Sequence, residues 1–349
     1  MKEGWKTNLL LKVCKVYQPQ TIATSKLIPG APYDVFGANG CIGKYDQYNH
    51  EEDEILLTCR GATCGNINRS TPKSWINGNA MVVHPISDNI TKDFLMYALK
   101  SIDFSKVITG AAQPQITRVS LASVTIPIPL LSEQERIVSL LDAEFAKIDA
   151  IKANSEKQLQ DAKALFQSAL QDLSSPKEGW KYLPFEKSIV KVKKQKSIKS
   201  KDYKEEGQYP VVSQESSLIS GYFDDASILY QHDTPVVIFG DHTQNVKYVD
   251  FDFIVGADGV HILSPIAEIT PKFFYYQLKS IKLRNLGYAR HYKLLKQESI
   301  FYPPLSEQQQ IAEQLDKLSA KIQSLQSNFD TTVTLCNDLK QSILKDIFG

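Results

Sequence analysis

The chain has few cysteines, no long apolar run and no visible signal-peptide pattern. Its five cysteines among 349 residues are an odd number without C-x-x-C spacing, which favours free thiols over zinc ligands or disulfides. No apolar run approaches the roughly 20 residues of a membrane span. The first apolar stretch, residues 9–11, is soon interrupted by Lys12 and Lys15, and no leader pattern is visible. We therefore expect a cytoplasmic protein that does not interact with membranes.

The sequence also lacks the short motifs that carry most enzyme chemistry. It has no G-x-G-x-x-G ahead of a helix, no H-E-x-x-H and no G-x-S-x-G. Residues 37–44 resemble a P-loop, but five residues rather than four separate its glycines, and Tyr45 stands where Ser or Thr would hold magnesium. Asp241 beside His242 could suggest acid–base work, but neighbours on a strand point to opposite faces. We therefore predict no catalytic residue, no metal site and no cofactor in this chain.

The net charge of +1 shows no bias toward nucleic acid, but the charge is uneven along the chain. Residues 187–204 contain only one acid, Asp202, among lysines 187, 191, 193, 194, 196, 199, 201 and 204. Such a run can bind phosphates, or it can be a solvated loop. The sequence leaves both interpretations open.

What the sequence does contain is a repeat of half its length. Residues 2–6, Lys-Glu-Gly-Trp-Lys, recur at 177–181, and Leu-Ser-Glu-Gln at 131–134 recurs at 305–308. A repeat of this size is the tandem duplication of a whole domain rather than a solenoid of short units. We therefore expect one operation carried out at two places.

Each repeat ends in a long helix. Proline at 127 and 129 excludes helix just before Ser132 and Glu135, which have the spacing of a capping box. From there to about residue 173 the chain has no proline or glycine, and apolar residues recur at helical spacing. The second copy has a sustained heptad stripe, as in a coiled coil. The predicted helix-pair interface consists of Leu141, Ile148, Leu159, Phe166, Leu315, Ile322, Phe329 and Ile343. The alternative is that each helix packs on its own globular domain.

The globular parts have an α+β pattern. Residues 54–58 and 234–239 are β-rich and bounded by turn residues, whereas residues 93–102 and 272–281 are helical in pattern. The predicted organisation is a first domain at 1–130, a long helix at 131–175, a second domain at 176–304 and a long helix at 305–349. The fold class is then two tandem α+β domains separated by two long helices, which form an antiparallel, pseudo-twofold symmetric coiled coil.

Polar side chains that can read or hold DNA are enriched in the loops of both copies. Asn and Gln pair with adenine and Arg and Lys with guanine in the major groove, while Lys, Arg and Tyr also hold phosphates. The candidates in the first copy are Lys44, Tyr45, Asn66, Asn68, Arg69, Gln113, Gln115 and Arg118. Those in the second are Lys193, Lys194, Gln214, Tyr222, His242, Thr243, Gln244, Asn245, Lys247, Arg290, His291, Tyr292 and Lys293.

Several of these motifs together resemble a known family. Pro-x-x-Ser-Glu-Gln-x-x-Ile begins at Pro129, and a form one residue shorter begins at Pro304. With the Gly-Trp-Lys openings at 4 and 179 and the runs 109–116, 239–243 and 287–292, they are similar to the specificity subunit of type I restriction–modification systems. The resemblance covers nearly the whole chain.

The resemblance implies two target-recognition domains that each read half of a split DNA sequence. It also implies partners that dock on the long helices, namely DNA-methyltransferase subunits, with two copies expected, and restriction or translocase subunits. S-adenosylmethionine, ATP and magnesium would belong to those partners. Two alternatives remain. A fused or stand-alone restriction endonuclease would need a Pro-Asp…Asp/Glu-x-Lys core, which the sequence lacks, and a coiled-coil scaffold would bind protein rather than DNA.

Overall fold

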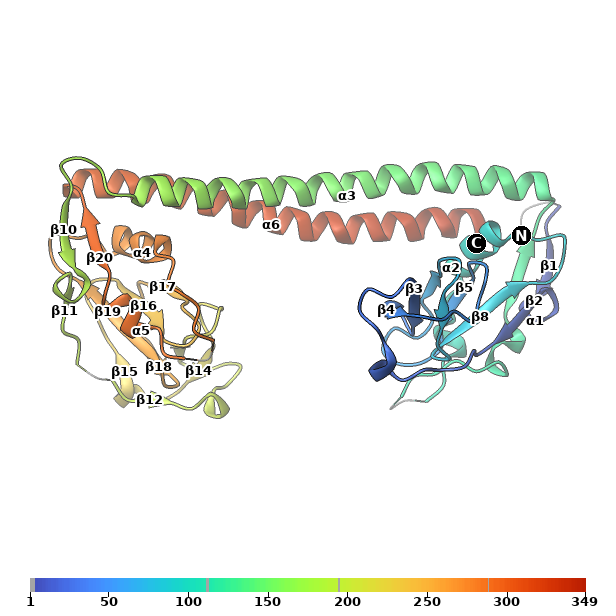
Figure 1. The fold of residues 1–349 in the computed structure, drawn as a ribbon, viewed down its shortest axis with the longest axis horizontal. Coiled ribbons are helices and arrows are strands. Elements are labelled where there is room, and N and C mark those ends of the chain that lie inside the picture. The colour runs from blue at the N-terminus through green and yellow to red at the C-terminus, as the bar shows by residue number, and fades with distance from the viewer. Residues whose placement is uncertain (1–3, 111–112, 194, 288) are drawn as a thin grey trace. The chain divides into compact units, whose positions relative to one another are not determined.

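The structure, a computed structural model, describes residues 4–110, 113–193, 195–287 and 289–349. It divides into two compact units: unit 1 is Met1–Ser155 with Asp330–Gly349, and unit 2 is Glu156–Phe329. Each unit holds one α+β domain and a part of both long helices (Figure 1). Within the described residues no helix is both long and apolar enough to cross a membrane.

The domain of unit 1 is built from short strands and two helices. In chain order they are β1 (Lys6–Leu9), α1 (Leu10–Val13), β2 (Cys14–Tyr17), β3 (Tyr33–Gly37), β4 (Gly40–Tyr45), β5 (Ile55–Thr58), β6 (Ile67–Arg69), β7 (Trp75–Ile76), β8 (Ala80–Pro85), α2 (Lys92–Lys100) and β9 (Thr125–Ile128). The strands form sheets in the orders β1-β9, β2-β8-β5-β6 and β4-β3-β7.

Strand β5 lies at the centre of this domain, which explains why all four of its residues are buried. Ile55 and Leu57 point to one face and pack with α2. Leu56 points to the other face and packs with Phe36 and Ile76 of the second sheet. Because side chains alternate along a strand, both faces must be covered for a continuous apolar run to be stable.

The domain of unit 2 repeats this construction. Its elements are β10 (Lys181–Pro184), β11 (Ile189–Val190), β12 (Ser197–Ile198), β13 (Tyr209–Val212), β14 (Gly221–Phe223), β15 (Leu229–Tyr230), β16 (Val236–Gly240), β17 (Val246–Val249), β18 (Phe253–Gly256), β19 (Val260–Pro265), α4 (Pro271–Ser280), α5 (Tyr292–Leu295) and β20 (Ser299–Tyr302). The sheets have the orders β10-β20, β11-β19-β16-β17 and β12-β18-β13-β14, and β15 pairs with β18. Here β16 takes the place of β5, with Val237 and Phe239 facing α4 and Val236 and Ile238 facing the other sheet.

The duplication extends to the strand register. Lys6 lies opposite Ile128 in the antiparallel pair β1-β9, and Lys181 lies opposite Tyr302 in β10-β20. Pro127, which excluded helix in the sequence, sits opposite Thr7 in that two-stranded sheet, a place where a missing N–H is tolerated. The predicted strands near 54–58 and 234–239 and the predicted helices near 93–102 and 272–281 are confirmed.

The long helices α3 (Leu131–Ser174) and α6 (Leu305–Phe348) have 44 residues each. In unit 1, Lys340 Nζ lies 2.6 Å from Asp149 Oδ1, and Leu344 shares a core with Leu141. In unit 2, Lys163 Nζ lies 3.0 Å from Gln326 Oε1. In unit 1 the residue number falls along α3 as it rises along α6, so the segments run antiparallel there, as the predicted fold class requires.

The apolar stripes of the long helices pack in both of the ways considered, against the other long helix and against a globular domain. Leu141 and Ile343 belong to the core of unit 1, while Phe166, Leu315 and Ile322 belong to that of unit 2, so helix segments pack on each other and on the domain. Ile148 and Leu159 are also buried, and Phe329 is half-buried. Phe348, near the end of α6, lies 5.4 Å from Phe94 between ring centroids and 6.2 Å from Trp5. The last turn of α6 therefore packs against the core of the first domain.

One local prediction was wrong. Ser132 and Glu135 do not form a capping box, because α3 begins at Leu131 and Ser132 already lies within the first turn. The N–H groups of Glu133 and Gln134 both donate to Leu130 O, at 2.9 and 3.0 Å. The repeated Ser-Glu-Gln motif therefore has a role other than a Ser cap.

Candidate nucleic-acid interface

In unit 1 two loops that are far apart in the sequence are joined. Gly61 N donates to Pro114 O at 3.1 Å, and Ile116 N donates to Cys59 O at 3.0 Å. Thr109 and Gln115 exchange two backbone hydrogen bonds of 2.9 Å each. The segment that follows β5 and the segment 109–116, excluding residues 111–112 outside the described ranges, therefore form one surface.

That surface presents four exposed polar side chains. Gln113, Gln115 and Arg118 were predicted from the sequence, and Arg60 joins them because it forms an isolated β-bridge with Gln115. Two amides and two guanidinium groups can pair with base edges or phosphates. Sequence reasoning missed Arg60; the signal was its position directly after a buried strand, at the start of the candidate loop.

Unit 2 joins the corresponding two loops through Asp241. Tyr292 N donates to Asp241 Oδ1 at 2.8 Å, and His291 N donates to Asp241 O at 2.8 Å. Burial would raise the pKa of Asp241, but the hydrogen bond from Tyr292 N–H and the nearby His261 ring outweigh burial and hold that pKa below its usual value. Asp241 is therefore a buried carboxylate that fixes His291 and Tyr292 against the β16–β17 turn.

A cleft of about 570 Å³ opens beside this junction. Lys191, Lys193 and Arg290 line it with exposed side chains. His261 lines it too, and its ring stacks on Tyr292 with centroids 3.7 Å apart. Burial lowers the pKa of His261 even though the Asp241 carboxylate lies 3.4 Å from its Nε2. The cleft thus combines exposed cationic side chains with stacked aromatic rings, a combination suited to a nucleic-acid backbone and its bases. Lys194 lies outside the described residues.

Several predicted DNA-binding side chains of unit 2 are used inside the domain instead. Lys247 is buried, and its Nζ donates to Ser213 O at 2.7 Å and to Ser217 O at 2.5 Å. His291 is also buried and holds Asp241 O and Leu286 N with its two ring nitrogens. Neither side chain is exposed to a ligand, so neither enters the interface proposed below.

Gln214 is the centre of a second internal network. Its Oε1 accepts from His242 N, while its backbone O accepts from Thr243 Oγ1 and Asn245 Nδ2. Gln244 has a φ of +58°, as the turn requires, and lines a cavity of about 830 Å³. Their part in DNA binding stays a prediction, as does that of half-buried Tyr222 and exposed Lys293.

In unit 1 the remaining predicted residues also have partners. Lys44 Nζ lies 2.8 Å from Asp34 Oδ1, and the ring of Tyr45 packs edge-on against Trp75. The amide groups of Asn66 and Asn68 both donate to Asn39 Oδ1, at 3.3 and 3.0 Å. The side chains of Asn66 and Asn68 are thus fixed at the β3–β4 turn, whereas Lys44 and Tyr45 lie at the opposite end of that hairpin. The role of all four in DNA binding stays a prediction.

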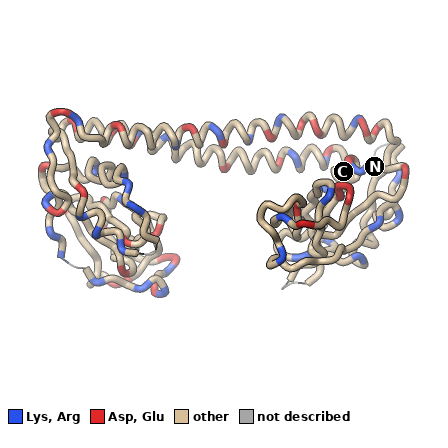
Figure 2. The backbone as a smooth tube through the Cα atoms, in the orientation of Figure 1, with Lys and Arg blue, Asp and Glu red and all other residues tan. Residues whose placement is uncertain are grey.

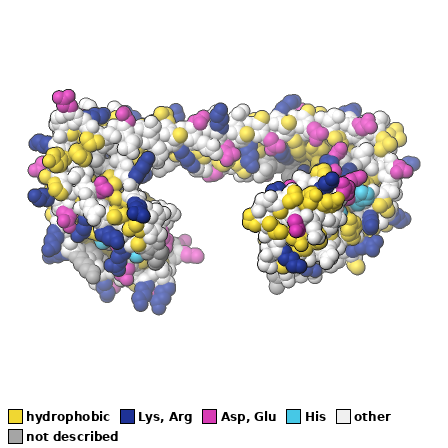
Figure 3. Space-filling model, viewed as in Figure 1, with side chains coloured by type: hydrophobic (Ala, Val, Ile, Leu, Met, Phe, Trp, Pro, Cys, Tyr) yellow, Lys and Arg dark blue, Asp and Glu magenta, His cyan; other side chains and the backbone are white. Residues whose placement is uncertain are grey.

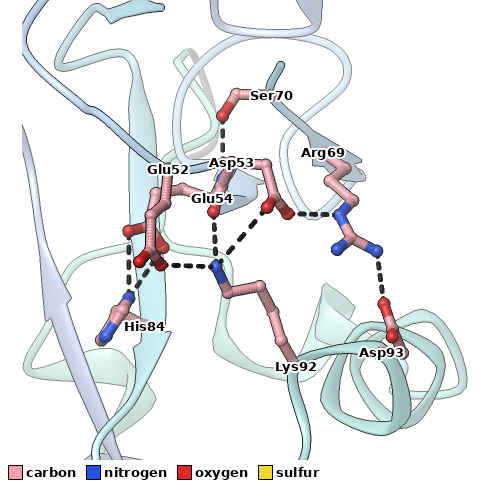
Figure 4. Close-up of polar contacts among 8 residues, drawn as sticks. All are labelled: Glu52, Asp53, Glu54, Arg69, Ser70, His84, Lys92 and Asp93. Carbon is pink, nitrogen blue, oxygen red and sulfur yellow. Dashed lines mark hydrogen bonds and ion pairs between the residues drawn. The ribbon is translucent and has the colours of Figure 1, made fainter. Parts of the chain in front are cut away.

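Arg69 belongs to a charged network on the surface of unit 1. Its guanidinium lies 2.5 Å from Asp53 and 2.5 Å from Asp93 (Figure 4). The carboxylate of Glu54, which is buried, lies 3.0 Å from His84 Nδ1 in the same network. Because both sides of Arg69 face carboxylates, contact with DNA would require it to leave at least one of them.

Lys and Arg are spread unevenly over unit 2. Figures 2 and 3 show a group of them at the end of the unit farthest from its helix segments, where Figure 1 places β12 of the lysine-rich stretch. Among the described residues, no three His, Cys, Asp or Glu side chains gather in a way that could hold a metal ion.

Comparison with known proteins gives a family match over most of the chain. The model of the type I restriction modification DNA specificity domain matches residues 2–161 and again residues 177–334. A protein of Mycoplasma pneumoniae named as a type I specificity subunit is 24% identical over 313 residues, which cover 84% of this chain and 92% of that protein.

Other relatives match over shorter segments. The specificity subunit of the type I restriction enzyme EcoprrI from Escherichia coli is 26% identical over 110 residues. A Haemophilus influenzae protein named for the same type of subunit is 30% identical over 115 residues. This chain matches only 27% and 29% of the length of these two relatives.

Solved structures share the fold. A structure described as the structural basis of complex assembly and conformational transition of the type I R-M system contains a chain with a TM-score of 0.72 and 18% identity, matched over 99% of this chain and 98% of that one. The HsdS subunit from Thermoanaerobacter tengcongensis has a TM-score of 0.52 and 18% identity, with 100% and 97% covered.

Proposed function

This chain belongs to the family defined by the type I restriction modification DNA specificity domain, and from that premise we propose that it is the non-catalytic subunit that reads a bipartite DNA target. Each α+β domain would read one half-site. In this proposal catalysis and its cofactors, S-adenosylmethionine, ATP and magnesium, belong to partner subunits.

The observation that carries this proposal is the pair of joined loops present in each domain with different side chains. In unit 1 the junction offers Arg60, Gln115 and Arg118, whereas in unit 2 it offers Arg290 beside Lys191. A shared frame with unlike polar loops is what two readers of unlike sequences require. We assign base contacts to Gln115 and Arg290 and phosphate contacts to Lys191 and Lys193.

The long helices provide the surface for partner proteins in this proposal. In unit 1, α3 exposes Leu140 and Ile151, and α6 exposes Leu335 and Leu339. Apolar side chains repeated on an exposed helix face suit docking of another helix. We propose that DNA-methyltransferase subunits, two in the complete complex, dock there and that restriction subunits join them in the cytoplasm.

The test is DNA retention in a mobility-shift assay with the full chain, its methyltransferase subunit and a random duplex library. We expect a retained fraction that is enriched for one sequence over successive rounds. Lys191→Ala with Lys193→Ala should weaken retention, whereas Lys181→Ala with Lys282→Ala, two exposed lysines outside the cleft, should not. Equal retention of all sequences after enrichment would contradict the proposal.

A further inference from the structure

The repeated Gln of the Ser-Glu-Gln motif is fully buried and fully bonded in both units. Gln134 Oε1 accepts from Thr91 N at 2.9 Å, and its Nε2 donates to Asn89 O at 2.7 Å and to Pro129 O at 3.0 Å. Its side chain therefore ties the first turn of α3 to the loop that enters α2. A buried amide keeps this arrangement only while all three partners stay in place, since an unpaired buried polar group is costly.

Gln308 makes the same three bonds in unit 2. Its Oε1 accepts from Thr270 N at 2.8 Å, and its Nε2 donates to Glu268 O at 2.8 Å and to Pro303 O at 2.9 Å. The first turn of α6 is thus tied to the loop that enters α4.

A second tie lies two helical turns farther along each long helix. The hydroxyl of buried Tyr97 in α2 donates to Asp142 Oδ1 of α3 at 2.5 Å, and the hydroxyl of Tyr276 in α4 donates to Asp316 Oδ1 of α6 at 2.5 Å. At 1.5 Å per residue the two ties in each unit are about 12 Å apart along the long helix. One tie fixes a single point of the domain on the helix, whereas two at this separation, together with the shared apolar core, fix its angle.

The leverage of this attachment is large. A domain of about 130 residues has a radius of gyration near 14 Å. Its far side therefore lies about 30 Å from its attachment to the long helix, which we call the root of the domain. A rotation of about 6° at the root would then displace the reading loops by about 3 Å, close to the rise of one base pair. The root is the same in both units, whereas the loops differ.

We infer that Gln134 with the Tyr97–Asp142 pair, and Gln308 with the Tyr276–Asp316 pair, are positioning residues that fix the angle at which each domain presents its loops to DNA. This inference rests on the proposed function. The ties then determine how strictly the gap between the two half-sites is measured, while the loops alone determine which bases are preferred.

The first test needs no DNA and concerns unit 1 alone. Spin labels at Ser139→Cys on α3 and Ala62→Cys on the loop after β5, with Cys41 and Cys64 changed to Ser, report the distance between helix and loop. Tyr97→Phe removes only the hydroxyl and should broaden the distance distribution; a rotation of about 6° would correspond to about 3 Å. Asp142→Asn keeps an acceptor for the hydroxyl and should leave the distribution narrow. Equal widths in wild type and Tyr97→Phe would overturn the inference.

The second test uses the target selected by the wild-type chain with its methyltransferase subunit, offered with the gap shortened or lengthened by one base pair. Tyr97→Phe with Tyr276→Phe should reduce discrimination against the wrong gaps by about fivefold, the size expected for loss of a hydrogen bond, with unchanged base preferences. Asp142→Asn with Asp316→Asn should discriminate like wild type. Unchanged discrimination against the wrong gaps in the Tyr→Phe chain would overturn the positioning role. A wild-type chain that selects no target would instead overturn the proposed function. The spin-label result would then decide alone whether the ties hold the domain.

Discussion

Lys247 was predicted from the sequence to bind DNA, but the structure buries it inside the domain. Replacing it with Met tests whether it is buried. Its ammonium group is buried between the carbonyls of Ser213 and Ser217. Burial lowers its pKa to about 8, although Glu215 acts in the opposite direction. The unfolded chain would have a lysine pKa near 10.4. Met has a similar length and no charge, so Lys247→Met removes this titration together with the two hydrogen bonds of the ammonium group.

The pH dependence has a definite sign. Between about pH 8 and pH 10.4 the unfolded state still binds the proton that the folded state has released, so the free energy of unfolding rises with pH over this window. Relative to Lys247→Met, the wild type should therefore gain about 2 kcal/mol between pH 7 and pH 10. The difference at a single pH is less informative, because the variant loses two hydrogen bonds and a buried charge together.

The assay is urea unfolding of wild type and Lys247→Met at several pH values with a thiol reductant. Salt dependence of DNA binding should be the same for both chains, because a buried ammonium releases no counterions. A difference in the free energy of unfolding that stays constant or falls as the pH rises would refute the burial of the Lys247 ammonium group. A flattened salt dependence of DNA binding in Lys247→Met would place this side chain at the DNA.

Three further predictions follow from the same surfaces. Lys191→Ala with Lys193→Ala should weaken binding to all sequences alike and flatten the slope of log K against log salt by about 2, measured by titration at several salt concentrations; an unchanged slope would remove these lysines from the interface. Arg290→Ala or Gln115→Ala should cost about 1–3 kcal/mol on the selected target and little on unrelated DNA; an equal loss on both would mean phosphate contact rather than base reading. Phe348→Ala should lower the stability of unit 1 by about 2 kcal/mol in urea unfolding, since the half-buried ring joins the core of the first domain; no change would mean that this aromatic contact contributes nothing.

The sequence was sufficient for the large features of the fold. Duplication, long helices and their apolar stripes depend on composition and period, which act locally along the chain. The helix bounds at Leu131 and Leu305 follow from the prolines just before them. The sequence showed the motifs 109–116 in unit 1 and 239–243 in unit 2, but not the loop that each of them contacts. Strand order decides which loops meet, and the motifs alone do not give that order.

The fate of individual polar side chains could not be predicted in this way. Lys247 and Lys191 are the same residue type, and the sequence does not distinguish their roles. Lys247 donates to carbonyls inside the domain, whereas exposed Lys191 lines a cleft. Gln134 was visible only as part of a motif, since its three backbone partners come from two other segments. Arg60 and His261 were missed because their positions depend on pairing across the sheet.

The most direct test of the central claim is a map of modified adenines in the genome of a host that carries this chain and its methyltransferase subunit. We predict marks at two short, unlike half-sites separated by a fixed, unread gap, and we predict that they disappear when the gene for this chain is deleted. Arg290→Ala should relax the map at one half-site only. Marks that persist without the chain, or a target that is one uninterrupted sequence, would contradict the account.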